Sequence, residues 1–304
     1  MSNVELIIER FSNLQFDKSP IIIITGPTGI GKSSLALSLA KKIDGIIINA
    51  DSMQIYKELK ILSSQPIEED KKFISHYLYG IRSIVEKFSV MEWLGLVNET
   101  LNIVSVKKKI PILVGGTGLY IRSAIEGVSK IPIINNKFLE KSKRLFNSVG
   151  ILEFRKIVRK IDSDFVIKNI DKHRLIRAHS VFLQTGINIS KWHKNSERFN
   201  LSNNYFCILL EQEREKIYEN CEKRFDDFIY KGAVDEVQLL IEKNFDRSLP
   251  GFKCLGVIWI LKYLEKKISL QDAILLSKRD TRRYVKRQLT WLRHNFNPDL
   301  IIQT

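Results

Sequence analysis

The chain has 304 residues, 44% of them hydrophobic, which is enough for one large domain or for a core with an insertion. Its formal net charge of +15 exceeds what an enzyme of small molecules needs and indicates a polyanionic partner, although a lysine-rich composition throughout would also produce it. Three widely spaced cysteines without a CxxC pair exclude a disulfide framework and a zinc site, and no apolar run could cross a membrane, so we expect a cytoplasmic protein.

A buried strand predicted at residues 21–25 leads directly into a glycine-rich loop. Residues 26–33 have the sequence GPTGIGKS, which fits the pattern GxxxxGK[ST], and a helix is predicted over 34–40. Glycines let backbone N–H groups point inward at phosphate oxygens, and the helix adds the positive end of its dipole. The pattern predicts a site for a phosphorylated small molecule, and a glycine-rich turn without a ligand is the alternative. The binding residues would be Gly26, Pro27, Thr28, Gly29, Ile30, Gly31, Lys32, which supplies a point charge, and Ser33, whose hydroxyl can hold Mg²⁺.

Two further apolar strands, predicted at 45–49 and 109–114, lie on either side of a helical pattern over 90–106. Asp51 follows the first of them, and Thr117 lies in the Gly-Gly-Thr-Gly turn that opens a helix after the second. Ligands of parallel sheets bind at the carboxyl ends of the strands, so we expect the glycine-rich loop, Asp51 and Thr117 to converge. Asp51 could ligate magnesium or act as a general base, and turn or helix-cap roles are the alternatives for both residues.

The second half of the chain is mainly helical in pattern. Helical spacing and basic residues dominate from 128 to 200, and one apolar strand is predicted at 205–210. Later helices are predicted over 214–244 with a break near Gly232, over 253–264 and over 277–294. We therefore predict an α/β fold, namely a P-loop NTPase-like parallel sheet core flanked by helices with an inserted helical subdomain. The core domain would comprise residues 1–127 and 201–304, with a C-terminal basic helix, and the insertion would comprise residues 128–200.

The last predicted helix contains KRDTRRYVKRQLTWLRH and carries most of the basic pattern. Val285, Leu289 and Leu292 form an apolar stripe along it. We interpret the cationic arc beside this stripe as a surface that contacts a phosphate backbone. The alternative is an ordinary solvated face paired with acids, although Asp280 is the only acid in the stretch. The arc consists of Arg279, Arg282, Arg283, Lys286, Arg287 and Arg293.

Over about residues 20–295 the chain resembles the tRNA dimethylallyltransferases, enzymes that prenylate the adenosine 3′-adjacent to the anticodon. The resemblance rests on GPTGIGKS at 26–33, ADSMQIYK at 50–57, ILVGGTGLYIR at 112–122, HRLIRA at 173–178 and VKRQLTWLR at 285–293. The chain departs from the family where IGY and a basic residue are common, because it has Leu255-Gly256-Val257-Ile258 there.

The resemblance implies transfer of a dimethylallyl group from dimethylallyl diphosphate to the N6 amine of that adenosine, with release of diphosphate. The diphosphate would lie in the loop at 26–33 with Mg²⁺ and Lys32, Asp51 would take the proton from N6, and Thr117 would position the diphosphate. Arg214 and Arg224 would clamp the diphosphate, with salt bridges as their alternative role. Partners would be the tRNA anticodon stem-loop and dimethylallyl diphosphate, and the enzyme would be a bacterial-form monomer. The residues matched to tRNA contacts are Asp51, Ser52, Met53, Gln54, His173, Arg174, Leu175, Ile176, Arg177, Lys253, Lys286, Arg287, Gln288, Leu289, Thr290, Trp291, Leu292 and Arg293.

Two other functions share parts of this pattern. A small-molecule or nucleoside kinase would have the same phosphate loop and sheet, but it would not explain the basic helix and would consume ATP. A non-catalytic RNA-binding P-loop protein would explain the charge without any transfer chemistry.

Overall fold

The computed structural model describes residues 2–14, 20–165, 171–195, 198–199, 201 and 204–304. The chain divides into two compact units, one of residues 1–125 with 201–304 and one of residues 126–200. The first boundary lies two residues before the one expected from the sequence, and the second coincides with it. Within the residues described, no helix combines the length and the apolar character needed to cross a membrane.

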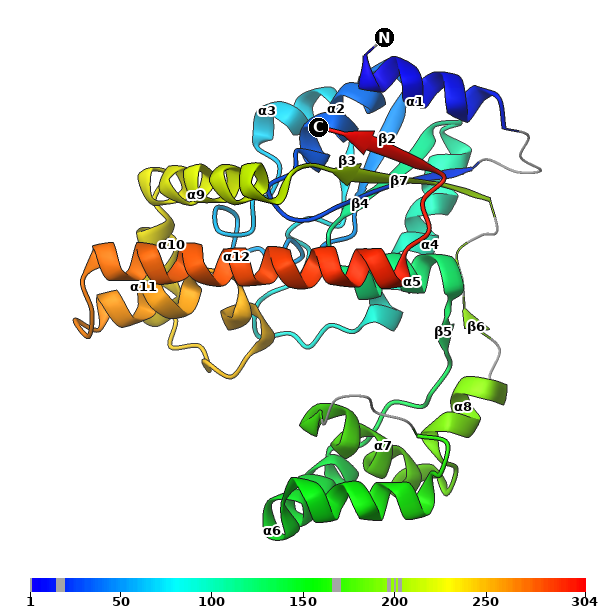
Figure 1. Ribbon diagram of the computed structural model, residues 1–304, viewed down its shortest axis with the longest axis vertical. Helices are drawn as coiled ribbons and strands as arrows, with labels where there is room; N and C mark the ends of the chain where they lie inside the picture. Colours follow the sequence, from blue (N-terminus) through cyan, green and yellow to red (C-terminus); the bar gives the residue numbers. More distant parts are fainter. Residues whose placement is uncertain (1, 15–19, 166–170, 196–197, 200, 202–203) are drawn as a thin grey trace. The chain divides into compact units, whose positions relative to one another are not determined.

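The first unit is built on a six-stranded parallel sheet with the strand order β3-β2-β4-β1-β7-β8 (Figure 1). The isoleucine-rich strands β1 and β2 are buried along their whole length, as expected for strands covered on both faces. In register, Thr25 at the end of β1 pairs with Gly115 of β4 and with Leu209 of β7. The strands are β1 (Ile21–Thr25), β2 (Gly45–Asn49), β3 (His76–Tyr77), β4 (Ile110–Gly115), β7 (Tyr205–Glu211) and β8 (Leu300–Gln303).

Helices cover this sheet and build a second apolar core beside it. The long helix α12 packs along α9 and against α11 (Figure 1). The core between α9, α10 and α11 also contains Ile55, Leu59 and Leu62. The helices of this unit are α1 (Asn3–Ser12), α2 (Lys32–Ile43), α3 (Glu68–Phe73), α4 (Val90–Val106), α5 (Gly118–Glu126), α9 (Arg214–Tyr230), α10 (Ala233–Glu242), η1 (Pro250–Lys253), α11 (Val257–Leu264) and α12 (Leu270–Asn295).

The described residues of the second unit form helices and one short antiparallel strand pair. Its core includes Phe154 and Val158 from α6 and Leu175, Ile176 and Val181 from α7, all nearly or fully buried. Gly150, with φ of 75°, interrupts the helical geometry of α6. The elements are β5 (Val128–Ser129), α6 (Asn136–Ile161), α7 (Lys172–Thr185), α8 (Ile189–Asn195) and β6 (Arg198–Phe199).

The structure confirms the α/β parallel sheet and the helical insertion, but some of its elements differ from the predicted ones. The sequence did not predict β3 or β8, which are two and four residues long and carry too few residues for a clear alternating pattern. Helix α12 begins at Leu270 rather than near residue 277, because the Ser269 side chain caps it by accepting the N–H of Asp272 at 3.0 Å.

Candidate functional site

The loop between β1 and α2 curls around the Lys32 ammonium group. Gly29 and Gly31 have φ of 84° and 93°, a region that favours glycine. Lys32 Nζ donates to the carbonyl oxygens of Gly26 at 3.0 Å and Pro27 at 2.7 Å. Burial lowers the pKa of Lys32 to about 8, although the charge of Asp51 acts in the opposite direction. The loop therefore holds a half-buried cation at the carboxyl end of β1, where a phosphate group could pair with it.

Helix α9 places a second cation against the same loop. Arg224 Nη2 donates to the Thr28 hydroxyl at 2.6 Å, and Cys221 Sγ donates to the Thr28 carbonyl oxygen at 3.3 Å. Burial lowers the pKa of Arg224, and among the described residues its Nε has no hydrogen-bond partner. A Cβ at Gly29 would lie 2.5 Å from Cys221 Sγ, so only glycine lets the loop and helix approach so closely. Arg214, by contrast, has a side chain more than half exposed, and it pairs with Glu215.

Asp51 and Thr117 lie beside each other at the ends of the neighbouring strands β2 and β4. Asp51 Oδ1 accepts the N–H of Met53 at 2.9 Å, and Thr117 Oγ1 accepts the N–H of Ser52 at 3.0 Å. The two turns touch at Gly115, where a Cβ would lie 2.0 Å from the carbonyl oxygen of Ala50. The expected convergence of the two turns at this sheet edge is therefore present.

These groups surround a cavity of about 880 Å³ in the first unit. Lys32, Ser33, Asp51 and Arg224 line it, whereas Thr117 faces Ser52 instead. Gln54 also lines the cavity, but its Nε2 already donates to the carbonyl oxygens of Ser63 and Ser64. Other sequence-predicted residues that line it are Thr28, Gly29, Gly31, Ser52, Met53, Lys253 and Arg287.

No sequence motif indicated the apolar and aromatic wall of this cavity. Leu62, Phe225, Phe228, Leu255 and Tyr284 all line it. Phe228 lies four residues after Arg224 on α9, on the same face of the helix, so a helical projection from Arg224 could have indicated it. Phe225 lies three residues before Phe228 and is its neighbour on the helix surface. Leu62 and Leu255 come from separate loops and carried no comparable pattern.

Helix α12 presents only part of its sequence-matched stretch to solvent. Lys286, Arg287, Thr290 and Arg293 are exposed, and Leu289 and Trp291 are half-buried. The side chains of Gln288 and Leu292 are only 7% and 6% exposed because they share the inward face with Val285. Gln288 and Leu292 are therefore corrected from tRNA-contacting side chains to interior ones.

The same correction applies to α7 in the second unit. Leu175 and Ile176 are buried in its core, so their side chains support the helix rather than contact RNA. His173, Arg174 and Arg177 are exposed on the outer face. The capping Asp171 accepts the N–H groups of His173 and Arg174 at 2.8 and 3.1 Å and holds the start of this face.

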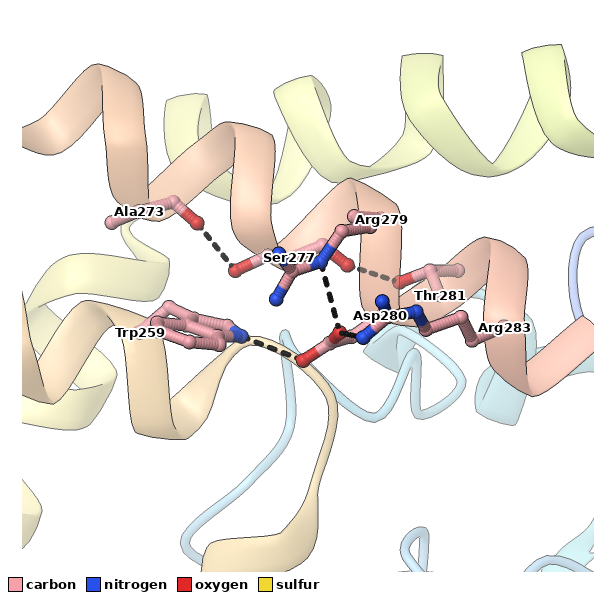
Figure 2. Close-up of polar contacts among 7 residues, drawn as sticks. All are labelled: Trp259, Ala273, Ser277, Arg279, Asp280, Thr281 and Arg283. Carbon is pink, nitrogen blue, oxygen red and sulfur yellow. Dashed lines mark hydrogen bonds and ion pairs between the residues drawn. The ribbon is translucent and has the colours of Figure 1, made fainter.

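The cations of α12 are more often paired than the sequence indicated, since α9 supplies acids. Arg282 forms an ion pair with Glu222, and Lys278 forms one with Asp226. Asp280 pairs with two further cations of α12 and with Trp259, as Figure 2 shows. Its Oδ1 lies 3.5 Å from Arg279 Nε and 3.4 Å from Arg283 Nη1, and its Oδ2 accepts the indole N–H of Trp259 at 2.8 Å.

Comparison of the sequence with known proteins identifies its family. The family model described as "IPP transferase" matches residues 54–295. The tRNA dimethylallyltransferase of Rickettsia bellii is 41% identical over 288 residues, which are 94% of this chain and 91% of the relative. The chain belongs to the IPP transferase family. Relatives in Ehrlichia chaffeensis and Pelagibacter ubique, 37% and 40% identical, are also named tRNA dimethylallyltransferase, and the chain is an enzyme of this family.

Solved structures of similar proteins extend the match to the fold. The tRNA isopentenylpyrophosphate transferase of Bacillus halodurans is 28% identical with a TM-score of 0.66, and the alignment covers 94% of this chain and 90% of that one. A eukaryotic dimethylallyltransferase acting on tRNA has a TM-score of 0.79 at 24% identity, covering 94% and 74% of the two chains, which shows the shared fold. The P-loop-like fold of this IPP transferase is confirmed.

Proposed function

We propose that this IPP transferase moves the dimethylallyl group of dimethylallyl diphosphate to the N6 amine of the adenosine 3′-adjacent to the anticodon of tRNA. The observation that carries the proposal is the meeting of two half-buried cations, Lys32 and Arg224, with the Asp51 carboxylate around one cavity. The cations suit a leaving diphosphate, and the carboxylate suits an amine that must lose a proton.

The diphosphate would lie in the loop at 26–33, where Lys32 and Arg224 offset the charge that develops as it leaves. Lys32 now donates to the loop carbonyls of Gly26 and Pro27, so a diphosphate would compete for the same ammonium protons. The Thr28 hydroxyl lies 2.6 Å from Arg224 Nη2 and would help to orient the guanidinium. Thr117 would donate its hydroxyl proton to the diphosphate in place of Ser52 Oγ, to which it now donates at 3.3 Å.

Asp51 would accept the proton of N6. Its Oδ1 is bound by the N–H of Met53, which leaves Oδ2 without a protein hydrogen-bond partner among the described residues. In the proposed step the bond from N6 to the allylic carbon forms, the bond from that carbon to the diphosphate oxygen breaks, and Asp51 takes the amine proton. A stacked base hides N6, so the adenosine would be flipped into the cavity.

Mg²⁺ is the proposed cofactor. Magnesium binds through one or two protein oxygen ligands together with substrate phosphates and water, so the hydroxyl of Ser33, which lines the cavity, suits it. No group of three or more His, Cys, Asp or Glu side chains suitable for a metal occurs in the described part of the chain, which agrees with an ion that shares its ligands with the substrate. Bound there, Mg²⁺ would neutralise charge on the leaving diphosphate.

The exposed cations would hold the anticodon stem-loop. Lys286, Arg287, Thr290 and Arg293 on α12, with half-buried Leu289 and Trp291 between them, form one proposed surface, and His173, Arg174 and Arg177 form another on α7. Lys253 and residues 51–54 line the cavity where the base would enter. We further propose that the enzyme acts as a cytoplasmic monomer.

The direct test is incubation with dimethylallyl diphosphate, Mg²⁺ and total tRNA without ATP, followed by mass spectrometry of the nucleosides. The expected product is N6-dimethylallyladenosine. A kinase would give no such product and would consume ATP, and a non-catalytic RNA-binding protein would bind tRNA without forming it. Either result would overturn the proposed function.

A further inference from the structure

The side chain of Gln288 on α12 joins two loops that are far apart in the sequence. Its Oε1 accepts the backbone N–H of Thr28 at 3.0 Å, and its Nε2 donates to the carbonyl oxygen of Gly116 at 2.9 Å. The two ends of one amide are an acceptor and a donor, so each end meets the complementary backbone group. Gln288 is only 7% exposed, which shields both hydrogen bonds from water.

The turn at Gly116 fits closely against this amide. A Cβ there would lie 2.7 Å from Gln288 Nε2, 3.3 Å from the carbonyl oxygen of Gly26 and 3.5 Å from Lys32 Nζ. On the other side, Thr28 also binds Arg224 through its hydroxyl and Cys221 through its carbonyl. Thr28 is therefore held by α9 and by α12 at once, and Gln288 sets its distance from the turn that carries Thr117.

We infer that Gln288 is a positioning residue for the diphosphate site and acts through Thr28 and Gly116 rather than by touching tRNA. It ties the loop that carries Lys32 to the helix whose outer face carries Lys286 and Arg287, so both proposed substrate sites share one support. This inference rests on the proposal that the loop at 26–33 holds the diphosphate. Gln288 lies within the stretch 285–293 that was matched to tRNA contacts, but it would support the binding of the diphosphate instead.

The test replaces Gln288 by methionine, which keeps the length of the side chain and removes both ends of the amide. Calorimetry measures the dissociation constant of inorganic diphosphate with Mg²⁺, and filter binding measures that of tRNA. Because Thr28 N–H and the Gly116 carbonyl lose their partner, we expect diphosphate to bind roughly tenfold more weakly, with tRNA affinity unchanged within about twofold. Gln271→Met is the matched control, since Gln271 lies exposed on the same helix, and it should change neither constant.

A second variant, Gly116→Ala, places a methyl group against Gln288 Nε2 and so disturbs its hydrogen bond to the Gly116 carbonyl oxygen. If Gln288→Met does not fold, Gly116→Ala alone should weaken diphosphate binding and leave tRNA affinity unchanged. The double variant should lose about as much diphosphate affinity as the weaker-binding single variant, because both remove one shared interaction. Full additivity, or a Gln288→Met protein that keeps diphosphate and loses tRNA, would overturn the inference. Wild-type protein that binds no diphosphate would overturn the proposed site, and the inference with it.

Discussion

The side chain of Asn49 binds both the N–H and the carbonyl oxygen of Asp51. Its Oδ1 accepts the N–H of Asp51 at 2.7 Å, and its Nδ2 donates to the carbonyl oxygen of Asp51 at 2.9 Å and to that of Leu78 at 3.0 Å. Asn49 is fully buried, and its own carbonyl oxygen accepts the indole N–H of Trp93 at 2.8 Å. The direction of the proposed base therefore depends on a residue that the sequence analysis did not single out.

Replacing Asn49 by aspartate should destabilise the protein and reduce transfer together. The new carboxylate would face two carbonyl oxygens that now accept hydrogen bonds, which costs about 2–4 kcal/mol for a buried group. Urea unfolding measures the stability, and single-turnover prenylation measures the rate. Asn102→Asp on the exposed side of α4 is the control and should leave both within error. An unchanged unfolding midpoint for Asn49→Asp would contradict this role.

Replacing Asp51 by asparagine should lower prenylation by about 100-fold or more while tRNA binding changes little, because the amide keeps the shape and cannot take the proton of N6. The rate is measured under single-turnover conditions and the binding by filter retention. Activity within threefold of the wild type would reject Asp51 as the base. Lost tRNA binding together with no transfer in the wild type would favour a binding-only protein.

Diphosphate affinity should fall as the pH rises above about 8. The pKa of Lys32 is lowered from 10.5 to about 8 by burial, so the ammonium that the diphosphate needs is lost above that pH, and binding above it should take up a proton. Calorimetry at pH 8.5 in two buffers of different ionisation enthalpy measures this proton. Lys32→Arg should remove the uptake, since arginine stays charged in this range. Equal heats in both buffers for the wild type would refute the assignment.

The lowered pKa of Lys32 also predicts that the stability of the fold rises with pH over the range in which diphosphate affinity falls. Between about pH 8 and 10.5 the unfolded chain keeps the proton on Lys32 and the folded chain has released it. The unfolded state then binds more protons, so the contribution of Lys32 to the free energy of unfolding rises with pH across this window and is constant below it. Comparing urea midpoints of the wild type and Lys32→Met from pH 7.5 to 10 isolates the effect. A difference that stays constant over this range would contradict it.

Neutralising Lys286 and Arg287 together should weaken tRNA binding across sequences and lower the slope of log affinity against log salt by about 1–2. Both side chains are exposed on α12, whereas Arg282 beside them is paired with Glu222 and would give a mixed result. The control is the exposed pair Lys41 and Lys42 on α2, changed to glutamine in the same way. An equal loss of slope in both double variants would show only a general charge effect.

Local patterns predicted the elements that are long and regular. The isoleucine runs of β1 and β2, the loop between β1 and α2, and the helices α4 and α9 follow from hydrophobic period and glycine spacing among residues that are neighbours in the chain. The convergence of the phosphate loop, Asp51 and Thr117 also followed, since the carboxyl ends of parallel strands share one edge. Strands β3 and β8 did not, because each is defined by its neighbour in the sheet rather than by its own pattern.

The sequence by itself determined the parallel sheet, the phosphate loop, the carboxylate beside it and the excess of cations on the last long helix. Only the tertiary structure decided which of those cations are free of acids on α9, which residues of α7 and α12 face inward, and that Gln288 reaches Thr28 and Gly116. The physical reason is the separation along the chain over which each kind of interaction acts. Propensity and periodicity act between residues a few positions apart, whereas an ion pair or a buried amide depends on segments that meet only after the chain has folded.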